Sequence, residues 1–296
     1  MRLRSNILLI AALLLIGAAG GWHFGLTRRW THRLAPGWSA SSEYVGTMTY
    51  ADPGTGRLPD RDAVTKYERS QRVSPDSSRP GSMVLEDRLA IRDIATRKMI
   101  WEYATWNVVD PRTGGLAAAA HRGDIAVFPR NVQRTTYRLR ANYVKGLPLS
   151  FERVESLDGL ATYVFAYRGP AEYTESFTGS AEYPGIITPP GEEIRCTDDQ
   201  FYYRVWIEPI TGEQVKLEEG CLSGDYYFNI ATGRRAGAVD RWNGVTAGDA
   251  LIQRIAEVRS LRSRYLWLTR YLPGAMLVVG VVLLGLSLRR WAPVAL

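Results

Sequence analysis

The sequence predicts a mainly β (α+β) protein in which an antiparallel, β-rich ectodomain lies between N- and C-terminal transmembrane helices. Three features predict this architecture: a long uncharged apolar segment near each end, short alternations of apolar and polar residues through the middle, and clusters of Pro and Gly between those alternations. With 296 residues, of which 46% are hydrophobic, the chain is long enough to bury a core and is unlike a disordered polymer.

Residues 1–29 are predicted to form an N-terminal transmembrane anchor. No charged side chain occurs between Arg4 and Arg28, and a helix needs roughly 20 mainly apolar residues to cross a bilayer. Two early arginines, an apolar core and small residues after it also describe a cleavable signal peptide; the length of the uncharged stretch favours an uncleaved anchor. Gly17 and Gly21 form a small-xxx-small pair, which predicts close packing against a second helix.

Residues 30–265 are predicted to form one β-rich extracytoplasmic domain. In the clearest run, Thr136 to Val144, Tyr, Leu and Ala alternate with Thr, Arg and Asn, as on a strand with one buried face. Pro and Gly clusters mark hairpin turns, because Pro fixes a negative φ and Gly permits a positive one. Similar runs cover 44–50, 84–91, 99–109, 160–167, 201–207 and 226–230; turn clusters cover 52–56, 110–114 and 208–212; linkers or loops are expected at 36–42, 52–59 and 73–82.

The end of the chain is predicted to be helical. Thr246 and Asp249 have the spacing of a helix cap, and apolar residues then recur at helical intervals, which predicts a juxtamembrane helix over about 248–265. Residues 266–296 are predicted to form a C-terminal transmembrane helix and a short cytoplasmic tail, with a kink at Pro273 near the interface.

The charge distribution argues against a nucleic-acid-binding protein. The formal net charge is +7, but eleven of the 37 basic residues are arginines at the two ends, outside the span from Glu43 to Glu257 that holds all 30 acidic residues. The remaining 26 basic residues leave the body slightly negative, whereas a nucleic-acid-binding domain carries its basic patch on the folded part. The arginines expected to flank the membrane on the domain side are Arg28, Arg29, Arg33, Arg259, Arg262, Arg264 and Arg270.

These observations predict a two-pass protein of the plasma membrane, with most of the chain extracytoplasmic and both termini cytoplasmic. A simple count of positive charges favours the opposite orientation, but that rule fails for long translocated domains. The domain-side arginines would then lie against anionic lipid headgroups.

No arrangement of residues predicts catalysis. The three histidines lack the spacing of a zinc site, and His121, the one candidate base for a hydrolase, has no nucleophile elbow beside it. We therefore expect no enzymatic activity, no cofactor and no metal; acidic pairs such as Asp198-Asp199 are interpreted as solvated loop charges rather than a calcium site. Cys196 and Cys221 are candidates for a structural disulfide, with two buried free thiols as the alternative.

The aromatic residues of two predicted strands are the candidates for lining a ligand cavity. Small β-barrels sometimes enclose one ligand, although ordinary core packing also explains aromatic strands, and adjacent residues of a strand face opposite sides. The candidate lining residues are Phe201, Tyr203, Trp206, Tyr226 and Phe228.

A set of local motifs is distributed along the predicted β-rich domain. The motifs are Glu86-Asp87-Arg88, Arg122-Gly123, Phe128-Pro129, Tyr137, Pro148, Phe151, Gly159-Leu160, Thr162-Tyr163, Phe165 and Glu208-Pro209-Ile210-Thr211-Gly212. Together with the layout of span, β-rich domain and span, these motifs resemble the actinobacterial porin PorA family. The family label implies a pore, whereas strands between two helical spans, in a body rich in Arg and Asp, do not suit a membrane β-barrel.

The leading functional hypothesis is a non-enzymatic cell-envelope protein whose ectodomain binds or passes lipid-like molecules close to the bilayer. The layout also resembles class B scavenger receptors, whose β-rich ectodomain between two spans conducts lipid, but fold alone does not fix function. The alternatives are a pore-forming or assembly subunit and a scaffold or sensor in an envelope complex. The expected partners are the lipid bilayer, a lipid-like ligand, and a second copy of the chain or another envelope protein, with no nucleic acid.

Overall fold

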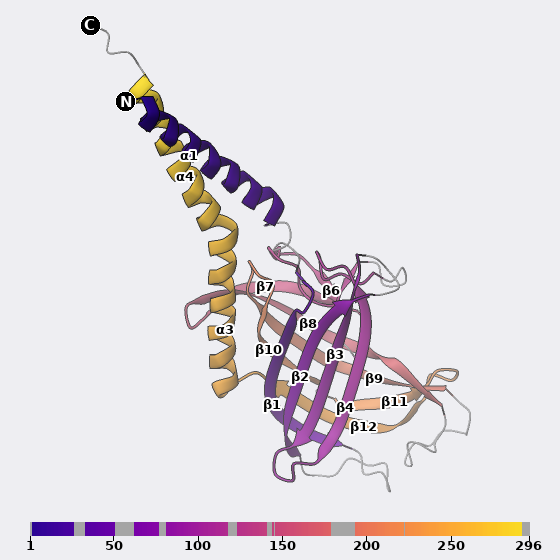
Figure 1. The fold of residues 1–296 in the computed structure, drawn as a ribbon. Helices are drawn as coiled ribbons and strands as arrows, with labels where there is room; N and C mark the ends of the chain where they lie inside the picture. Colours follow the sequence, from indigo (N-terminus) through magenta and orange to yellow (C-terminus); the bar gives the residue numbers. More distant parts are fainter. Residues whose placement is uncertain are drawn as a thin grey trace.

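Two apolar helices lie side by side and extend away from a β-rich body (Figure 1). The computed structural model describes residues 2–26, 33–50, 62–76, 81–117, 123–140, 144, 146–178, 193–221 and 223–291. The first helix, α1 (Arg2–Gly21), continues as a π-helical turn, η1 (Trp22–Leu26). At the other end α3 (Gly248–Leu266), a π-helical segment η3 (Trp267–Tyr271) and α4 (Leu272–Trp291) form one continuous helical rod.

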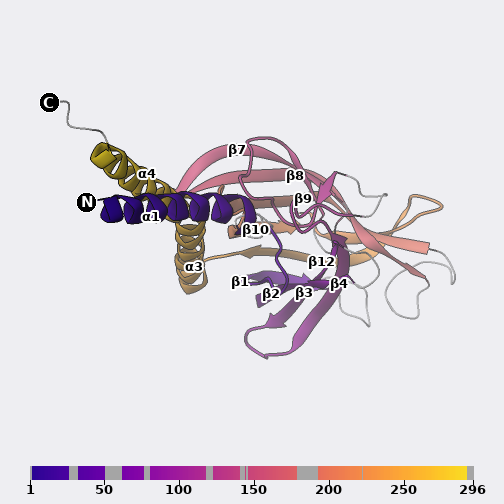
Figure 2. The same ribbon diagram turned by 45° about the horizontal axis from the view of Figure 1, so that its top comes forward.

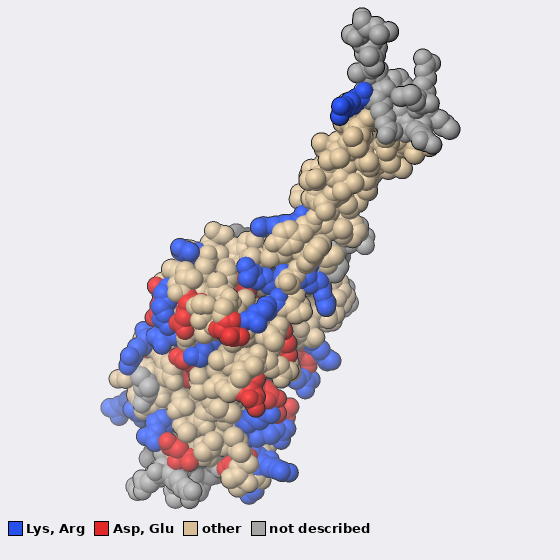
Figure 3. All heavy atoms as spheres, turned by 90° about the vertical axis from the view of Figure 1, so that its left-hand side faces the viewer, with Lys and Arg blue, Asp and Glu red and all other residues tan. Residues whose placement is uncertain are grey.

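Both helices are long and apolar enough to span a membrane. The apolar stretches cover Asn6–Gly25 and the far part of Gly248–Arg289, and most of their large side chains are exposed, as lipid-facing residues are. On the face seen in Figure 3, the helical pair shows no charged side chain between a basic one near its outer end and the basic side chains that gather where it meets the body. The two termini lie at the same end of the pair (Figure 1).

The helices pack closely through a different glycine from the one expected. A Cβ atom on Gly280 would lie 2.8 Å from Ile16 Cγ1 and 3.2 Å from the Ala12 carbonyl oxygen, so the backbones approach one another there. A Cβ atom on Gly17 or Gly21 would meet nothing within 4 Å, so these two glycines do not form the predicted contact.

Twelve strands form one strongly curved sheet. Its order is β4-β3-β2-β1-β12-β10-β9-β8-β7-β6-β5, and β11 lies between β12 and β9 beyond the end of β10. All the paired strands are antiparallel except β5 and β6, which are parallel. The strands are β1 (Ser39–Tyr50), β2 (Ala63–Pro75), β3 (Met83–Asp93), β4 (Met99–Val109), β5 (Asp124–Ile125), β6 (Tyr137–Leu139), β7 (Leu147–Leu157), β8 (Leu160–Thr178), β9 (Glu193–Ile207), β10 (Gln214–Cys221), β11 (Asp225–Asn229) and β12 (Arg235–Val245).

The sheet curls until its two halves face each other across a single core (Figure 2). Single bridges from Val109 to Leu116 and from Gly115 to Ile125 bring the free edge of β4 back towards β5, so the sheet approaches a closed barrel. The core between the halves is aromatic: Tyr44 stacks on Tyr67 with ring centroids 4.7 Å apart, and further rings follow from the neighbouring strands.

The predicted strands are present, but their lengths differ from the expectation. The run at 136–144 contributes only the three residues of β6, and residues 141–143 lie outside the described residues. Two segments expected to be loops belong partly to strands, since β1 begins at Ser39 and β2 ends at Pro75. Of the three expected turns, the one at 208–212 joins β9 to β10 and the one at 110–114 follows β4, while 52–56 lies outside the described residues.

The helix α3 packs across the outer face of the sheet, where Ile255 and Val258 contact an apolar patch that includes Trp206 and Val215. Its start differs from the prediction: Ala247 is the N-cap residue and makes no side-chain cap. Thr246 instead joins the sheet, because its backbone N–H donates to the Leu217 carbonyl at 2.9 Å and its Oγ1 accepts from the Leu217 N–H at 3.2 Å. The helix therefore starts from a point fixed to β10.

Candidate functional site at the barrel seam

The wall of the barrel opens beside α3, and we call this opening the seam. The central strand β12 ends at Val245, which pairs with Val45 of β1 on one side and Glu218 of β10 on the other. Nearer the membrane helices, the first half of β1 pairs with β2 and the first half of β10 pairs with β9. Among the described ladders, none joins β1 directly to β10 there, so the two strands diverge.

Arg254 of α3 occupies the seam in place of a strand. Its Nε donates to the backbone carbonyl of Gln214 at 2.8 Å, which satisfies an acceptor at the open edge of β10. Its Nη1 faces Glu257 at 3.3 Å, one turn further along the same helix. The guanidinium group is well suited to this place because it offers several donors in a fixed plane.

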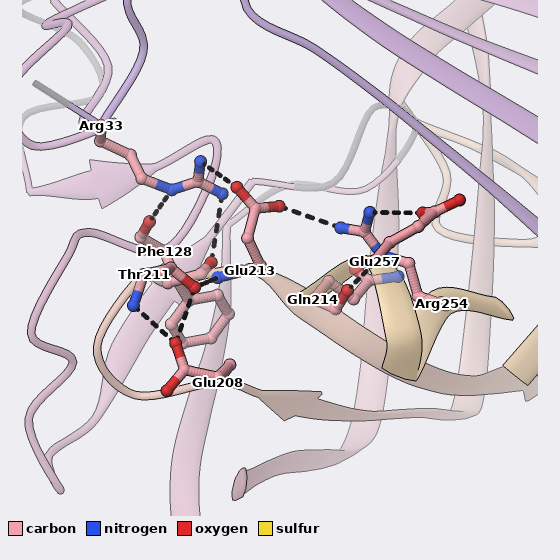
Figure 4. Close-up of polar contacts among 9 residues, drawn as sticks. Arg33, Phe128, Glu208, Thr211, Glu213, Gln214, Arg254 and Glu257 are labelled. Carbon is pink, nitrogen blue, oxygen red and sulfur yellow. Dashed lines mark hydrogen bonds and ion pairs between the residues drawn. The ribbon is translucent and has the colours of Figure 1, made fainter. Parts of the chain in front are cut away.

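Glu213 joins Arg254 to the chain that leads from the N-terminal helix (Figure 4). One carboxylate oxygen accepts from Arg33 Nη1 at 2.8 Å and the other accepts from Arg254 Nη2 at 2.9 Å. The side chains of Glu213 and Arg33 are only 9% and 3% exposed. Burial raises the pKa of Glu213, but Arg33 and Arg254 outweigh burial and hold it below its usual value.

Arg33 is fixed by backbone oxygens as well as by this ion pair. Its Nε donates to the Phe128 carbonyl at 2.8 Å and its Nη2 donates to the Gly212 carbonyl at 3.1 Å. Gly212 has φ of +74°, and a Cβ there would lie 2.2 Å from the Pro129 carbonyl oxygen, so this turn requires glycine. In the same turn, Glu208 accepts from the N–H and hydroxyl of Thr211, both at 2.7 Å. The turn between β9 and β10 is thus built to hold Arg33.

A small cavity lies on the inner side of the seam. It has a volume of about 50 Å³, and Arg254, Arg69 and Gln71 are among its lining residues. Arg69 binds Asp87 through two hydrogen bonds of 3.0 and 2.7 Å, and Gln71 donates to the same carboxylate at 2.7 Å. Tyr203 also lines this cavity, and burial raises the pKa of its hydroxyl. The inner side of the seam therefore combines charged and hydrogen-bonded groups with apolar side chains.

A larger groove lies on the outer side of the seam, between α3 and the outward face of β1, β2 and β3. Its volume is about 880 Å³, and a neighbouring hollow of about 410 Å³ shares Arg254 and Glu257 with it. Arg254 lines the inner cavity and both outer hollows. Most of the residues that line the groove are polar or charged types; they are Ser39, Ala40, Ser41, Ser70, Gln71, Arg72, Glu86, Arg88, Arg254, Glu257, Ser260 and Leu261.

The predicted lining residues do not come together around one aromatic cavity. Phe201 and Tyr203 are 0% and 1% exposed and belong to the packed core. Trp206 lies on the opposite face of β9, beneath α3, where the Lys216 ammonium sits 4.2 Å from its ring. On β11, Tyr226 and Phe228 are half-buried, and the fully buried side chain is that of their neighbour Tyr227, because the predicted face of that strand is reversed.

The predicted membrane-flanking arginines fall into three groups. Arg33 is buried, and Arg259 and Arg262 face domain carboxylates, with Arg259 3.2 Å from Asp158 and Arg262 3.4 Å from Glu208. These three arginines therefore hold the helices to the barrel rather than to headgroups. Arg264 and Arg270 are exposed, and Arg28 and Arg29 lie outside the described residues.

The register of β9 separates the two cysteines. Cys221 is a free, buried cysteine opposite Phe201, whereas Cys196 pairs with Tyr227 further along the same strand. At about 3.3 Å per residue, this offset exceeds the Cα separation of about 7 Å that a disulfide allows. Cys221 is therefore a buried free thiol, as in the alternative to the predicted disulfide. The side chain of Cys196 lies outside the described residues.

The residues that build the seam belong to recognisable sequence patterns, but each pattern is explained by local structure alone. Glu208-Pro209-Ile210-Thr211-Gly212 indicates a turn, and nothing in that pattern indicates that its carbonyls bind an arginine from far along the chain. Arg254 belongs to the predicted juxtamembrane helix, where an arginine on a polar face is ordinary. Long-range pairing of this kind appears only in the fold.

Comparison with known families agrees with the architecture. The family model described as Porin PorA matches residues 5–289, nearly the whole chain. The chain belongs to the Porin PorA family. The predicted resemblance is thereby confirmed, and this member of the family has a large, mainly antiparallel sheet flanked by two long apolar helices.

Other comparisons add no function to the family assignment. No curated protein matches the chain. A putative exported protein with a YmcC-like fold from Bacteroides fragilis is 10% identical, with 71% of this chain and 95% of that chain covered and a TM-score of 0.20. A conserved hypothetical protein with a double hotdog fold from Mycobacterium tuberculosis is 12% identical, with 79% and 80% covered and a TM-score of 0.16. Scores this low carry no structural argument.

Proposed function

We propose that this Porin PorA family member is a non-enzymatic, two-pass envelope protein whose ectodomain binds the polar headgroup of lipid-like molecules in the groove beside α3. The observation that carries the proposal is the position of this groove: one of its walls is α3, which continues through η3 into the apolar helix α4. Leu261 at the membrane-proximal end of the groove is about 16 Å along the helix from the start of α4.

The chemistry of the groove suits a headgroup better than an acyl chain. Hydroxyl, amide, guanidinium and carboxylate groups alternate along its walls, and such groups bind sugars, polyols and phosphates through hydrogen bonds. Glu86 accepts from Arg88 at 2.6 Å and also pairs with Arg72, so one carboxylate is shared by two guanidinium groups and these three side chains keep a net positive charge. A volume of about 880 Å³ lies within the usual range of small-molecule sites.

The packing of the interior supports binding at the wall rather than passage through the core. The aromatic side chains of the two sheet halves contact one another and fill the barrel. An aliphatic chain inside the barrel would have to displace them, at the cost of breaking a close-packed core. The hydrocarbon part of a bound molecule is therefore better placed in the bilayer beside the helices.

The same arrangement supports the two-pass topology that we propose. The antiparallel pair of helices puts both termini at one end, opposite the barrel (Figure 1). A two-pass topology with the barrel outside the cytoplasm and both termini inside is consistent with this pairing, and the barrel then faces the lipids of the outer leaflet and of the envelope beyond it.

Native mass spectrometry of the full-length protein, released from detergent after purification from membranes, tests the proposal. We expect a reproducible added mass of a lipid in the native protein and its loss in Ser70→Trp, which fills the groove from an exposed position on β2. Val64→Trp is the matched control, since Val64 is exposed on the same outward face of β2. The proposal is wrong if no lipid is retained, or if Ser70→Trp retains as much as Val64→Trp.

The pore that the family label implies is tested in the same preparation. Discrete conductance steps in planar bilayers, from an oligomer that native mass spectrometry resolves and that carries no lipid in the groove, would favour a pore subunit over a lipid-binding protein.

A further inference from the structure

A second buried site lies on the far side of the barrel from the membrane helices, where β10 gives way to β11. Both strands run between β9 and β12, so they act as one long strand with a break after Cys221. Gly224 in the break has φ of +86°, and the register with β12 shifts immediately after Asp225. Breaks of this type redirect side chains within a sheet.

The break brings acidic and thiol groups from separate strands together. Ligand atoms of Asp198 on β9, Cys221 on β10 and Asp225 on β11 lie within 4.8 Å of one another. These residues are 0%, 3% and 3% exposed, respectively. Asp240 on β12, 5% exposed, is the register partner of Asp225 and adds a third buried carboxyl group.

Neighbouring groups orient these side chains and leave other ligand atoms open. Asp198 Oδ1 accepts from the Gln200 N–H at 2.8 Å and from Ser223 Oγ at 3.0 Å, whereas its Oδ2 is buried and accepts no hydrogen bond. Asp240 Oδ1 is likewise buried and accepts none. Burying a carboxylate oxygen without a hydrogen-bond partner costs folding free energy, so a ligand that binds these oxygens would recover part of that free energy.

Trp242 fixes the other two groups from outside the cluster. Its indole Nε1 donates to Asp225 Oδ2 at 3.1 Å, and its backbone N–H donates to Cys221 Sγ at 3.2 Å. Hydrogen bonds of this kind orient metal ligands in known metal sites.

Burial raises the pKa of Asp240, and the neighbouring acids Asp225 and Asp198 raise it further. Burial likewise raises the pKa of Asp198 and of the Cys221 thiol. These groups therefore resist ionisation in the metal-free protein, and a bound ion has to displace their protons.

We propose that Asp198, Cys221 and Asp225 form a binding site for a divalent transition-metal ion, with the Asp240 carboxylate beside Asp225 available to complete it. A thiolate combined with carboxylates matches Zn²⁺, whereas Ca²⁺ and Mg²⁺ prefer oxygen alone. Tetrahedral zinc bonds of about 2.0–2.3 Å place ligand atoms about 3.3–3.8 Å apart, so the present cluster needs only a small contraction. Binding releases the Cys221 thiol proton to solvent as the sulfur becomes a thiolate. This proposal differs from the sequence-based expectation of no metal.

Metal binding to the full-length protein in detergent, after removal of metals by a chelator, tests the site. Co²⁺ alone is the spectroscopic probe and Zn²⁺ alone is the competitor. We expect one Co²⁺ per chain with a thiolate charge-transfer band, displacement by Zn²⁺, and a higher thermal midpoint with Zn²⁺ that excess chelator reverses.

Three variants separate the site from a general effect on folding. Cys221→Ser should abolish the charge-transfer band, and Asp198→Asn should weaken Zn²⁺ binding by more than about tenfold. Asp199→Asn is the matched control, because Asp199 is exposed and binds the Tyr226 hydroxyl instead. Since Asp198→Asn removes a buried acid, the metal-free variant should be at least as stable as the metal-free native protein, so loss of binding will not reflect misfolding.

The proposal is overturned if neither ion binds in a one-to-one ratio. It is also overturned if the band persists in Cys221→Ser, which would assign the thiolate to Cys196, or if Asp199→Asn weakens binding as much as Asp198→Asn.

Discussion

The Glu213→Gln substitution removes the charge that joins Arg33 to Arg254, and we expect it to lower the free energy of unfolding by about 3 kcal/mol. Removing one partner of a buried ion pair costs about 3–5 kcal/mol, because the other charge remains buried without compensation. The lower end applies here, since Arg33 keeps two backbone carbonyl acceptors and Arg254 keeps the Gln214 carbonyl.

Urea unfolding of the full-length protein in detergent micelles, followed by tryptophan fluorescence, measures this loss. Glu218→Gln is the control: Glu218 lies on β10, which begins directly after Glu213, its side chain is 27% exposed, and it pairs with Lys216 at 2.6 Å. We expect about 0–1 kcal/mol for the control. Equal losses in the two variants, or a loss below about 1 kcal/mol for Glu213→Gln, would refute the assignment of Glu213 as the link between the helices and the barrel.

Three further outcomes are expected. Although burial raises the pKa of Glu213, its two guanidinium partners outweigh burial and hold the pKa low. The contribution of Glu213 to the free energy of unfolding is therefore complete above the unfolded pKa of about 4.3 and is lost as pH falls through the folded pKa. Acid should lower the urea midpoint more steeply in the native protein than in Glu213→Gln. Gly280→Leu should separate the apolar helices and weaken inter-helix cysteine cross-linking, whereas Gly285→Leu, with no atom within 4 Å, should not. Gly212→Ala should lower the thermal midpoint more than Gly233→Ala, because both have positive φ but only Gly212 faces a clash.

The elements with strong local signals were predictable from the sequence. The apolar helices follow from uncharged stretches at both ends, and the predicted helix at 248–265 corresponds to α3 (Gly248–Leu266). The segment predicted at 99–109 is β4 (Met99–Val109). In these segments the local sequence pattern and the tertiary environment favour the same secondary structure, so the pattern alone is sufficient to predict the element.

One strand that the sequence analysis missed, β2, has an unusual inner face. On β2 the inward positions include Arg69 and Gln71, which bind Asp87 of β3. A strand with charged residues on its buried side does not show the alternation of apolar and polar residues that identifies strands. Its polar positions are paired by residues distant in sequence, and no local rule specifies those partners.

The same limit applies to both candidate sites. Arg33 and Arg254 are far apart along the chain and meet only because Glu213 lies between them. Asp198 and Cys221 become neighbours only because β10 is interrupted. Short-range motifs cannot predict these long-range contacts, because each contact depends on the register of the sheet.

The rod from Gly248 to Arg289 spans 42 residues, or about 63 Å, and it carries Arg254 near one end. Tilting is one way in which a helix adapts to a thinner bilayer. Because α3, η3 and α4 are continuous, we expect a change in the tilt of the apolar part to reach α3, where it would alter the contacts of Arg254 with Gln214 and Glu213.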